Sequence, residues 1–172
     1  MLYKSESIIL KTIPYSESSL VVIAFSKDYG RLALMAKGVK KSKTSQKGHL
    51  QSFMHNTLSY SKKSGMGILT SAFNINHFPE LVTDIDKLSL AYEALTITHS
   101  VIQENQANES LFELLLQTLL NFNNAPSQKA PAHLNNFKKN FMALEGILPS
   151  NQNIANIDKM IGNYIDTPII KF

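Results

Sequence analysis

Basic side chains are concentrated in a short stretch, AKGVKKSKTSQKGHLQSF, at residues 36–53. It holds five lysines between Lys37 and Lys47 and no acidic residue. The surrounding segment 29–79 also lacks Asp and Glu, although it contains Arg31, Lys62 and Lys63 as well. Lysine ammonium groups neutralise phosphates and release their counterions without reading a base sequence. These residues therefore favour the binding of a polyanion, and the alternative is a lysine-rich loop that is only solvated.

The distribution of charge along the chain supports the same chemistry. The net charge is only +4, but residues 1–80 carry eleven basic residues against four acidic ones. Residues 81–172 carry six basic residues against nine acidic ones. An asymmetry of this kind between the two halves predicts a polyanionic partner for the first half.

Residues for catalysis or metal binding form no recognisable pattern. The chain contains no phosphate-binding loop, dinucleotide motif or nucleophile elbow. It has no cysteine, and its histidines match no metal-ligand spacing. We therefore predict no catalytic residues, no metal and no other cofactor, and an enzyme with an unrecognised site is the remaining alternative. The histidines, which we expect to be scattered over the surface or in hairpins, are His49, His55, His77, His99 and His133.

The chain also lacks the sequence features of export. Its first residues, MLYKSESIILKTI, have no charge-free apolar region of the kind found in signal peptides. The longest wholly apolar run, at 20–25, is far too short to cross a bilayer. Together with the absence of cysteine, these features lead us to expect a soluble, cytoplasmic protein with no membrane contact.

The elements that must position the cations are short strands. Segments 7–11 and 19–25 are rich in β-branched residues, and a turn at 27–30 leads into a third strand, RLALMAKG. Two more strands, within 51–61 and 68–75, flank the turn KKSGMG. Gly30 and Gly38 would allow the turn and the departure of the basic loop from the third strand. Five closely spaced strands predict a small closed barrel or sandwich, with the basic stretch between strands three and four.

Apolar residues at helical spacing indicate helices in the second half, around 88–102, 108–122, 131–144 and 154–164. Asp84 and Asp86 are typical of a helix start, where carboxylates favour the positive end of the dipole. Gly146 can end the third helix. We place the domain boundary near residue 79, which gives a barrel domain at 1–79 and a helical domain at 80–172. The buried face predicted for the third helix consists of Leu134, Phe137, Phe141 and Leu144.

Three aromatic residues are interleaved with the lysines of the first half: Phe53, Tyr60 and Phe73. Small five-stranded barrels bind oligonucleotides on one face, where aromatic side chains stack on the bases. The same residues could equally form the barrel core, so both alternatives remain open at this point.

The sequence resembles the bacterial recombination mediator family RecO. The resemblance is carried by IILKTIPYSESSLVVIAFSKDYGRLALMAKGVKKSKTSQKGHLQSF and LSY in the first half. The segments FPELVTDIDKLSLAYEALTI and LFELLLQTLL match more loosely in the second half. The resemblance implies an α+β chain, all-β and then all-α, with a five-stranded OB-fold barrel before a small helical domain. It also implies DNA binding, strand annealing, cooperation with RecR and contact with the acidic tail of single-stranded-DNA-binding protein.

The chain departs from the family pattern in its helical half. Many relatives carry a four-cysteine zinc module there, whereas the corresponding stretch, about 146–157, is short and has no cysteine. We therefore expect the zinc module to be absent. The ending IGNYIDTPIIKF resembles the family's ending, which favours internal loss over truncation.

The leading hypothesis is a non-enzymatic mediator that binds single- and double-stranded DNA and acts with RecR, with RecF as a further candidate partner, near the nucleoid. A second hypothesis is an RNA-binding OB module of the translation apparatus. For an acidic tail peptide we predict a site at Phe137, Lys138, Lys139 and Phe141, and the alternative is that these lysines are only the solvent face of a helix. The predicted DNA contacts are Arg31, Lys37, Lys40, Lys41, Lys43 and Lys47.

Overall fold

The chain is represented by a computed structural model that describes residues 1–39, 46–147 and 156–165, with only the backbone described at 46 and 47. These residues form two compact units. The first unit contains Met1–His77 together with Ile102–Glu109. The second contains Phe78–Val101 and the described residues from Ser110 onward. The segment 102–109 therefore packs with the barrel, although it lies in the helical half of the sequence.

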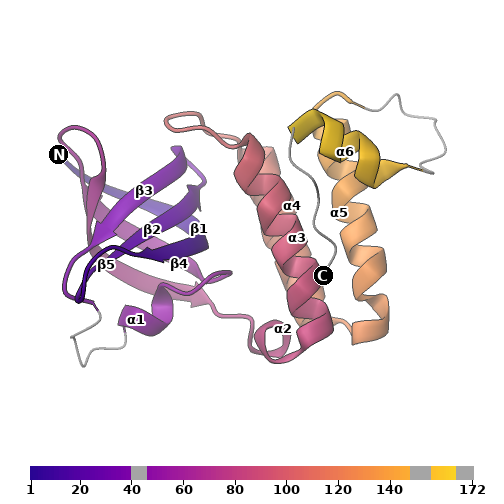
Figure 1. The fold of residues 1–172 in the computed structure, drawn as a ribbon, viewed down its shortest axis with the longest axis horizontal. Coiled ribbons are helices and arrows are strands. Elements are labelled where there is room, and N and C mark those ends of the chain that lie inside the picture. Colours follow the sequence, from indigo (N-terminus) through magenta and orange to yellow (C-terminus); the bar gives the residue numbers. More distant parts are fainter. Residues whose placement is uncertain (40–45, 148–155, 166–172) are drawn as a thin grey trace. The chain divides into compact units, whose positions relative to one another are not determined.

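The first unit is a closed five-stranded barrel, as predicted (Figure 1). Going around the barrel, the strand order is β1-β2-β3-β5-β4, which closes on itself. Neighbouring strands are antiparallel except β3 and β5, which are parallel at Leu34 and Met35. This is the connectivity of an OB-fold. The strands are β1 (Leu2–Pro14), β2 (Leu20–Ser26), β3 (Gly30–Ala36), β4 (His55–Ser61) and β5 (Gly67–Asn76).

A short helix, α1 (Gln46–His49), lies between β3 and β4 and was not predicted from the sequence. Its four residues carry no helical apolar repeat, because a single turn is too short to show a period of 3.6 residues.

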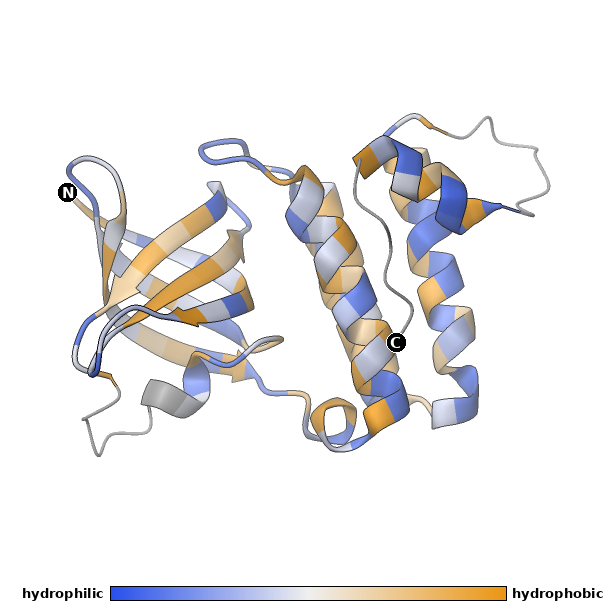
Figure 2. Ribbon diagram, in the orientation of Figure 1, coloured by the Kyte–Doolittle hydropathy of each residue, from blue (hydrophilic) through white to orange (hydrophobic). Residues whose placement is uncertain are grey.

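Alternation along β3 shows how the barrel separates its core from its surface. Leu32, Leu34 and Ala36 are buried in the barrel core, whereas Arg31 and Met35 are half-buried on the other side of the strand. Successive side chains of a strand point to opposite faces, so Arg31 lies on the outer surface of the barrel. The apolar inner residues account for the hydrophobic colouring of the strands in Figure 2, where the connecting turns are mainly hydrophilic.

The three aromatic residues interleaved with the lysines differ in exposure, which separates core residues from those that could stack on a base. Phe53 and Tyr60 are each 2% exposed, and Tyr60 belongs to the barrel core. Phe73 is 65% exposed on β5. Only Phe73 of the three is therefore placed to stack on a ligand.

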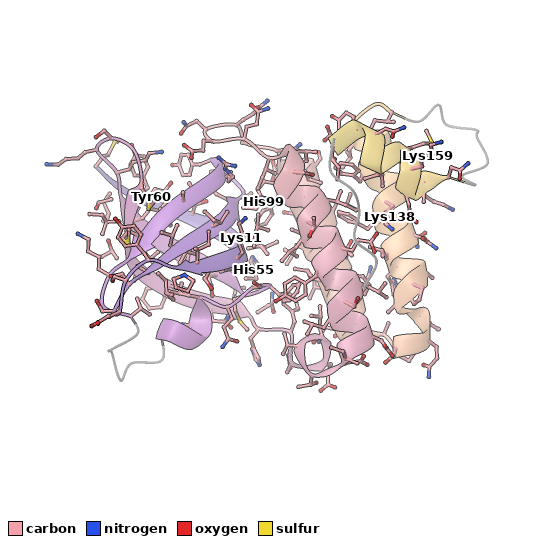
Figure 3. All side chains as sticks on the ribbon, viewed as in Figure 1. Lys11, His55, Tyr60, His99, Lys138 and Lys159 are labelled. Atoms are coloured by element: carbon pink, nitrogen blue, oxygen red, sulfur yellow. The ribbon has the colours of Figure 1, made fainter. Side chains whose placement is uncertain are left out.

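Tyr60 of the barrel core, which Figure 3 labels, forms a cluster with Tyr3 and Tyr29, which are partly buried against the core. The rings of Tyr3 and Tyr60 are stacked with their centroids 5.3 Å apart, and Tyr29 meets Tyr3 edge-on at 5.7 Å. Burial, followed by the nearby Tyr29, Tyr3 and Asp28, raises the pKa of Tyr60 to about 12. Tyr60 therefore ionises only at a pH well above that at which an exposed tyrosine loses its proton.

The second unit is helical. Asp84 ends α2 and caps α3, because its Oδ1 accepts the backbone N–H of Asp86 at 3.0 Å and of Lys87 at 3.2 Å. The predicted role of Asp84 and Asp86 at a helix start is confirmed. The hydroxyl of Ser127 also donates to Asp84, and this bond and the Lys87 N–H lower the pKa of the carboxyl. The helices are α2 (Pro79–Thr83), α3 (Ile85–Val101), α4 (Glu109–Asn124), α5 (Ala130–Leu144) and α6 (Ile157–Ile165), with a 3₁₀ turn at Ser127–Lys129.

The C-terminus of α5 is closed as the sequence predicts. Gly146 has φ +68°, and its N–H donates to the carbonyl of Ala143 at 3.2 Å. The next N–H, of Ile147, reaches back to the carbonyl of Met142 at 2.9 Å. This pair of bonds is a Schellman motif, which requires a left-handed residue that glycine supplies at little cost.

Two helical residues differ from expectation. Leu144, predicted on the buried face of α5, is 46% exposed because it is the last residue of the helix, where the packed face has ended. Ile102 is buried but follows the end of α3 and belongs to the barrel unit. Ile154, predicted in the last helix, lies outside the described residues.

Candidate nucleic-acid interface

Two of the six predicted DNA contacts lie at the two ends of strand β3. Arg31 is the second residue of β3, and Lys37 follows its last residue with an exposed side chain. At about 3.3 Å per residue the two positions lie roughly 20 Å apart along the strand. That length would accommodate about six nucleotides at 3.4 Å each, within the site sizes of single OB-folds.

Gly30, the first residue of β3, and Gly38, just after its end, adopt conformations that allow the predicted turns. Gly30 and Gly38 have φ +67° and +71°, which is the left-handed region that other residues seldom adopt. Gly38 stands in open space and turns the chain into the basic loop. The remaining predicted contacts in that loop, Lys40, Lys41 and Lys43, lie outside the described residues, as does the side chain of Lys47.

Two further cations lie near the start of β3, and the predicted set of contacts omits them. Because β5 begins beside Leu34, the β4–β5 turn lies next to the first residues of β3. That turn carries Lys62, which is half-buried, and Lys63, which is exposed. Their distance of some thirty residues from Arg31 in the sequence hides this proximity, which only the pairing of β3 with β5 creates.

The outer surface of β1, β4 and β5 surrounds the exposed ring of Phe73. Its cross-strand neighbour on β4 is Thr57, whose neighbour on β1 is Glu6. The adjacent row carries Ser71, Ser59 and Lys4, of which Lys4 is exposed. Small polar residues leave the ring accessible from the side, an arrangement that suits stacking on a base beside a cation.

The histidines were expected at the surface or in hairpins, and His55 lies in the hairpin formed by β4 and β5, where it is buried. It is 2% exposed, and its Nε2 lies 2.7 Å from Oε1 of Glu6. The amide of Asn76 donates to its Nδ1 at 3.1 Å, which leaves Nε2 as the ring nitrogen that donates to Glu6. These bonds join β1, β4 and β5 through one side chain, which is a structural role.

The predicted peptide site on α5 is mostly buried. Phe137 and Phe141 are 1% and 0% exposed, and Lys138 is 3% exposed. The ammonium of Lys138 forms ion pairs with Glu93 of α3 and with Asp158 of α6, the latter at 2.7 Å. Figure 3 labels Lys138 on α5 next to α6. Of the four predicted residues only Lys139 is exposed to a partner.

A pocket of ≈ 650 Å³ opens on the surface of α3. Its lining is mainly apolar, but it includes one carboxylate, Asp86. The described residues that line it are Ile85, Asp86, Leu88, Ser89, Tyr92 and Thr96.

Among residues 1–39, 46–147 and 156–165, no group of three or more His, Asp or Glu side chains is arranged to hold a metal ion. In the same part of the chain, no helix is both long and apolar enough to cross a membrane.

The closed barrel and its strand order define an OB-fold protein, a class whose members bind oligonucleotides or oligosaccharides on the barrel and its loops. Comparison with known families narrows the class. The profile described as "Recombination protein O N terminal" matches residues 1–78, and "Recombination protein O C terminal" matches residues 82–163. The chain belongs to the RecO family of DNA repair proteins.

Individual relatives agree with this assignment. The DNA repair protein RecO of Halalkalibacterium halodurans is 34% identical over 119 residues, covering 69% of this chain and 47% of the relative. The protein of the same name from Syntrophus aciditrophicus is 36% identical over 121 residues, 69% of this chain and 46% of the relative. That of Desulfatibacillum aliphaticivorans is 30% identical over 149 residues, 85% of this chain and 57% of the relative. The chain thus spans about half the length of the curated relatives it matches.

Proposed function

We propose that the protein is a non-enzymatic recombination mediator that binds single- and double-stranded DNA through its barrel and anneals complementary strands. It would then help RecR to load recombinase onto DNA covered by single-stranded-DNA-binding protein, with RecF as a further candidate partner, in the cytoplasm near the nucleoid. One observation carries this proposal. An OB barrel of the RecO family contains a 51-residue segment without acidic residues, and this segment places cations at both ends of β3.

The physical basis of annealing is charge neutralisation. Two complementary strands repel each other through their phosphates, and a surface that neutralises several phosphates lowers this repulsion while the bases pair. Lysine suits the task because its ammonium group contacts any phosphate without selecting a base. Sixteen of the seventeen basic residues are lysines, which supports binding that is indifferent to sequence.

DNA binding of this kind should depend steeply on salt. If about four cations contact phosphates, the logarithm of the binding constant should fall against the logarithm of the salt concentration with a slope of roughly −3 on single strands. Replacing Lys40, Lys41 and Lys43 by Ala should weaken binding while the unfolding free energy changes by about 0.5 kcal/mol or less per site. A flat salt response, or full affinity in the folded triple variant, would argue against the lysine–phosphate mechanism.

The alternative is an RNA-binding OB module of the translation apparatus. The two functions are separated by measuring binding and annealing on DNA and RNA strands of equal length and sequence. A mediator should anneal complementary DNA strands, including strands covered by single-stranded-DNA-binding protein. Tight binding of RNA with no acceleration of DNA annealing would favour the RNA-binding module.

We also propose that the acidic tail of single-stranded-DNA-binding protein binds the helical unit. Lys139 is the exposed cation of the predicted site, whereas Asp86 in the α3 pocket would repel an acidic peptide. The test is Lys139→Glu, with Lys159→Glu as the matched control, because Lys159 is an exposed lysine of α6 in the same unit. Lys139→Glu should weaken the tail peptide about three-fold or more, and Lys159→Glu much less. Equal effects would place the tail elsewhere.

A further inference from the structure

One loop of the chain's helical half is bound to the barrel by its backbone. We call residues 102–109, which link α3 to α4 and include the first residue of α4, the strap. The backbone N–H of Arg31 donates to the carbonyl of Gln103 at 2.9 Å, and Gly30 forms an isolated antiparallel bridge with Glu104. The strap therefore adds a short backbone pairing to the start of β3.

The fit between the strap and β3 depends on Gly30. A Cβ atom at that position would lie 2.2 Å from the carbonyl oxygen of Gln106 and 2.3 Å from that of Gln103. Real Cβ atoms do not approach backbone oxygens so closely, so only glycine admits the strap at this distance. Because these contacts are made by backbone atoms, they do not depend on the side chain of Glu104.

The carboxylate of Glu104 stands between two cations of the candidate DNA interface. Its Oε1 lies 3.9 Å from Nη2 of Arg31, and its Oε2 lies 3.8 Å from Nζ of Lys62. Both separations exceed the 2.7–2.9 Å of a charge-assisted hydrogen bond. The attraction is therefore Coulombic and weak, and the Glu104 side chain remains 43% exposed to water.

This acid comes from outside the acid-free segment. The segment 29–79 supplies Arg31 and Lys62 but no carboxylate to balance them. A carboxylate held between two cations marks a place where those cations can also hold a phosphate. We propose that Arg31 and Lys62 form a phosphate site, which Glu104 of the strap fills in the free protein and leaves when DNA binds. This inference rests on the proposed function.

A phosphate can displace the carboxylate for physical reasons. It carries one negative charge and oxygens that can approach Arg31 to hydrogen-bond distance, and the guanidinium fork can hold two of them at once. Glu104, already half in water, regains its hydration at little cost when it moves away. The carboxylate of Glu104 thus lowers affinity for any polyanion that cannot reach both cations. It thereby raises the relative preference for a phosphate chain that can reach them.

The test measures binding of a labelled single-stranded oligonucleotide to the full chain by fluorescence anisotropy at fixed salt. Two variants remove the carboxylate: Glu104→Gln keeps the side-chain shape, and Glu104→Ser leaves no amide that could itself bind phosphate. Each should bind DNA about five-fold more tightly, as expected for the loss of two weak exposed ion pairs that compete with DNA. Glu80→Gln, an exposed acid of α2 in the helical unit, makes the same change in net charge and should have little effect.

A second set of variants tests whether Arg31 and Lys62 are the cations that Glu104 blocks. In Arg31→Gln/Lys62→Gln protein, removing Glu104 should give no gain in affinity, because the carboxylate then has no phosphate site to block. An unchanged affinity of both Glu104 variants, an equal gain in Glu80→Gln, or a gain that persists in the double background would each overturn the inference. If instead the unmodified protein binds no DNA at all, the proposed function itself fails.

Discussion

The buried ion cluster around Lys138 leads to the sharpest prediction about the helical unit. The Lys138 side chain is 4% exposed, and its charge is balanced by Glu93, 11% exposed, and Asp158, 34% exposed. The three residues come from α5, α3 and α6, so one ammonium group joins three helices. Replacing Lys138 by Met keeps the apolar stem and removes only the charge.

The expected cost follows from the carboxylates left behind. Removing one partner of a buried ion pair costs about 3–5 kcal/mol, because the other charge stays buried without compensation. Asp158 is exposed enough to be hydrated, so Glu93 accounts for most of the loss, and we expect about 3 kcal/mol. Adding Glu93→Leu removes the stranded charge and should restore most of the stability, since apolar replacement of a whole buried pair is often close to neutral.

Urea unfolding followed by far-UV circular dichroism measures this effect, because the long helices lie in the second unit. With a slope of about 2 kcal/mol per molar urea, Lys138→Met should lower the midpoint by roughly 1.5 M. The matched control is Lys139→Met, its exposed neighbour, which should stay within about 0.5 kcal/mol of the unmodified protein. If Lys138→Met costs no more than Lys139→Met, or if Glu93→Leu brings no recovery, the cluster does not stabilise the unit.

Three other outcomes are expected. Gly30→Ala should lower the free energy of unfolding in urea by about 2 kcal/mol or more, because its Cβ would collide with the strap. Gly38→Ala, with a similar φ but open space around it, should cost only about 1 kcal/mol. Equal losses in the two variants would refute the tight contact. Stability should fall as pH rises from about 10 to 12, because Tyr60 ionises near 10 when unfolded but at about 12 when folded, and Tyr60→Phe should remove that part of the decline. Chelators should leave unfolding and DNA binding unchanged, since the chain has no cysteine, and stoichiometric zinc in untagged protein would contradict this.

Local patterns sufficed to predict the five strands and most of the helices, whereas the choice of a barrel over a sandwich came from the family resemblance. Short runs rich in β-branched residues mark strands such as β2. Gly146 and Asp84 mark helix ends because each acts through atoms a few residues away. The helix α1 and the exposure of Leu144 escaped prediction, because one turn has no measurable period and the end of a packed face depends on neighbouring helices. The pattern of hydrophobic residues thus predicts helices and strands well, but it does not show where the buried face of a helix ends.

The candidate site was less accessible from the sequence, since it depends on distant residues. The acid-free stretch was visible in the sequence, but Glu104 lies more than seventy residues from Arg31 and reaches it only through the strap. Similarly, Lys138 next to Lys139 is indistinguishable from a solvent-exposed pair until α3 and α6 are seen to pack against it. A count of charges along a chain gives the sign of a surface but not which of its charges are already neutralised.

The burial of Lys138 changes how the proposed peptide site on α5 must be tested. Reversing both Lys138 and Lys139 to Glu would place a third carboxylate beside Glu93 and Asp158, so any loss of peptide binding could arise from unfolding of the helical unit. Lys139→Glu alone leaves the buried cluster intact and changes only the exposed charge. A loss of tail affinity with an unchanged urea midpoint would then place the peptide beside Lys139. Unchanged affinity with an unchanged midpoint would show that the tail does not use this face of α5.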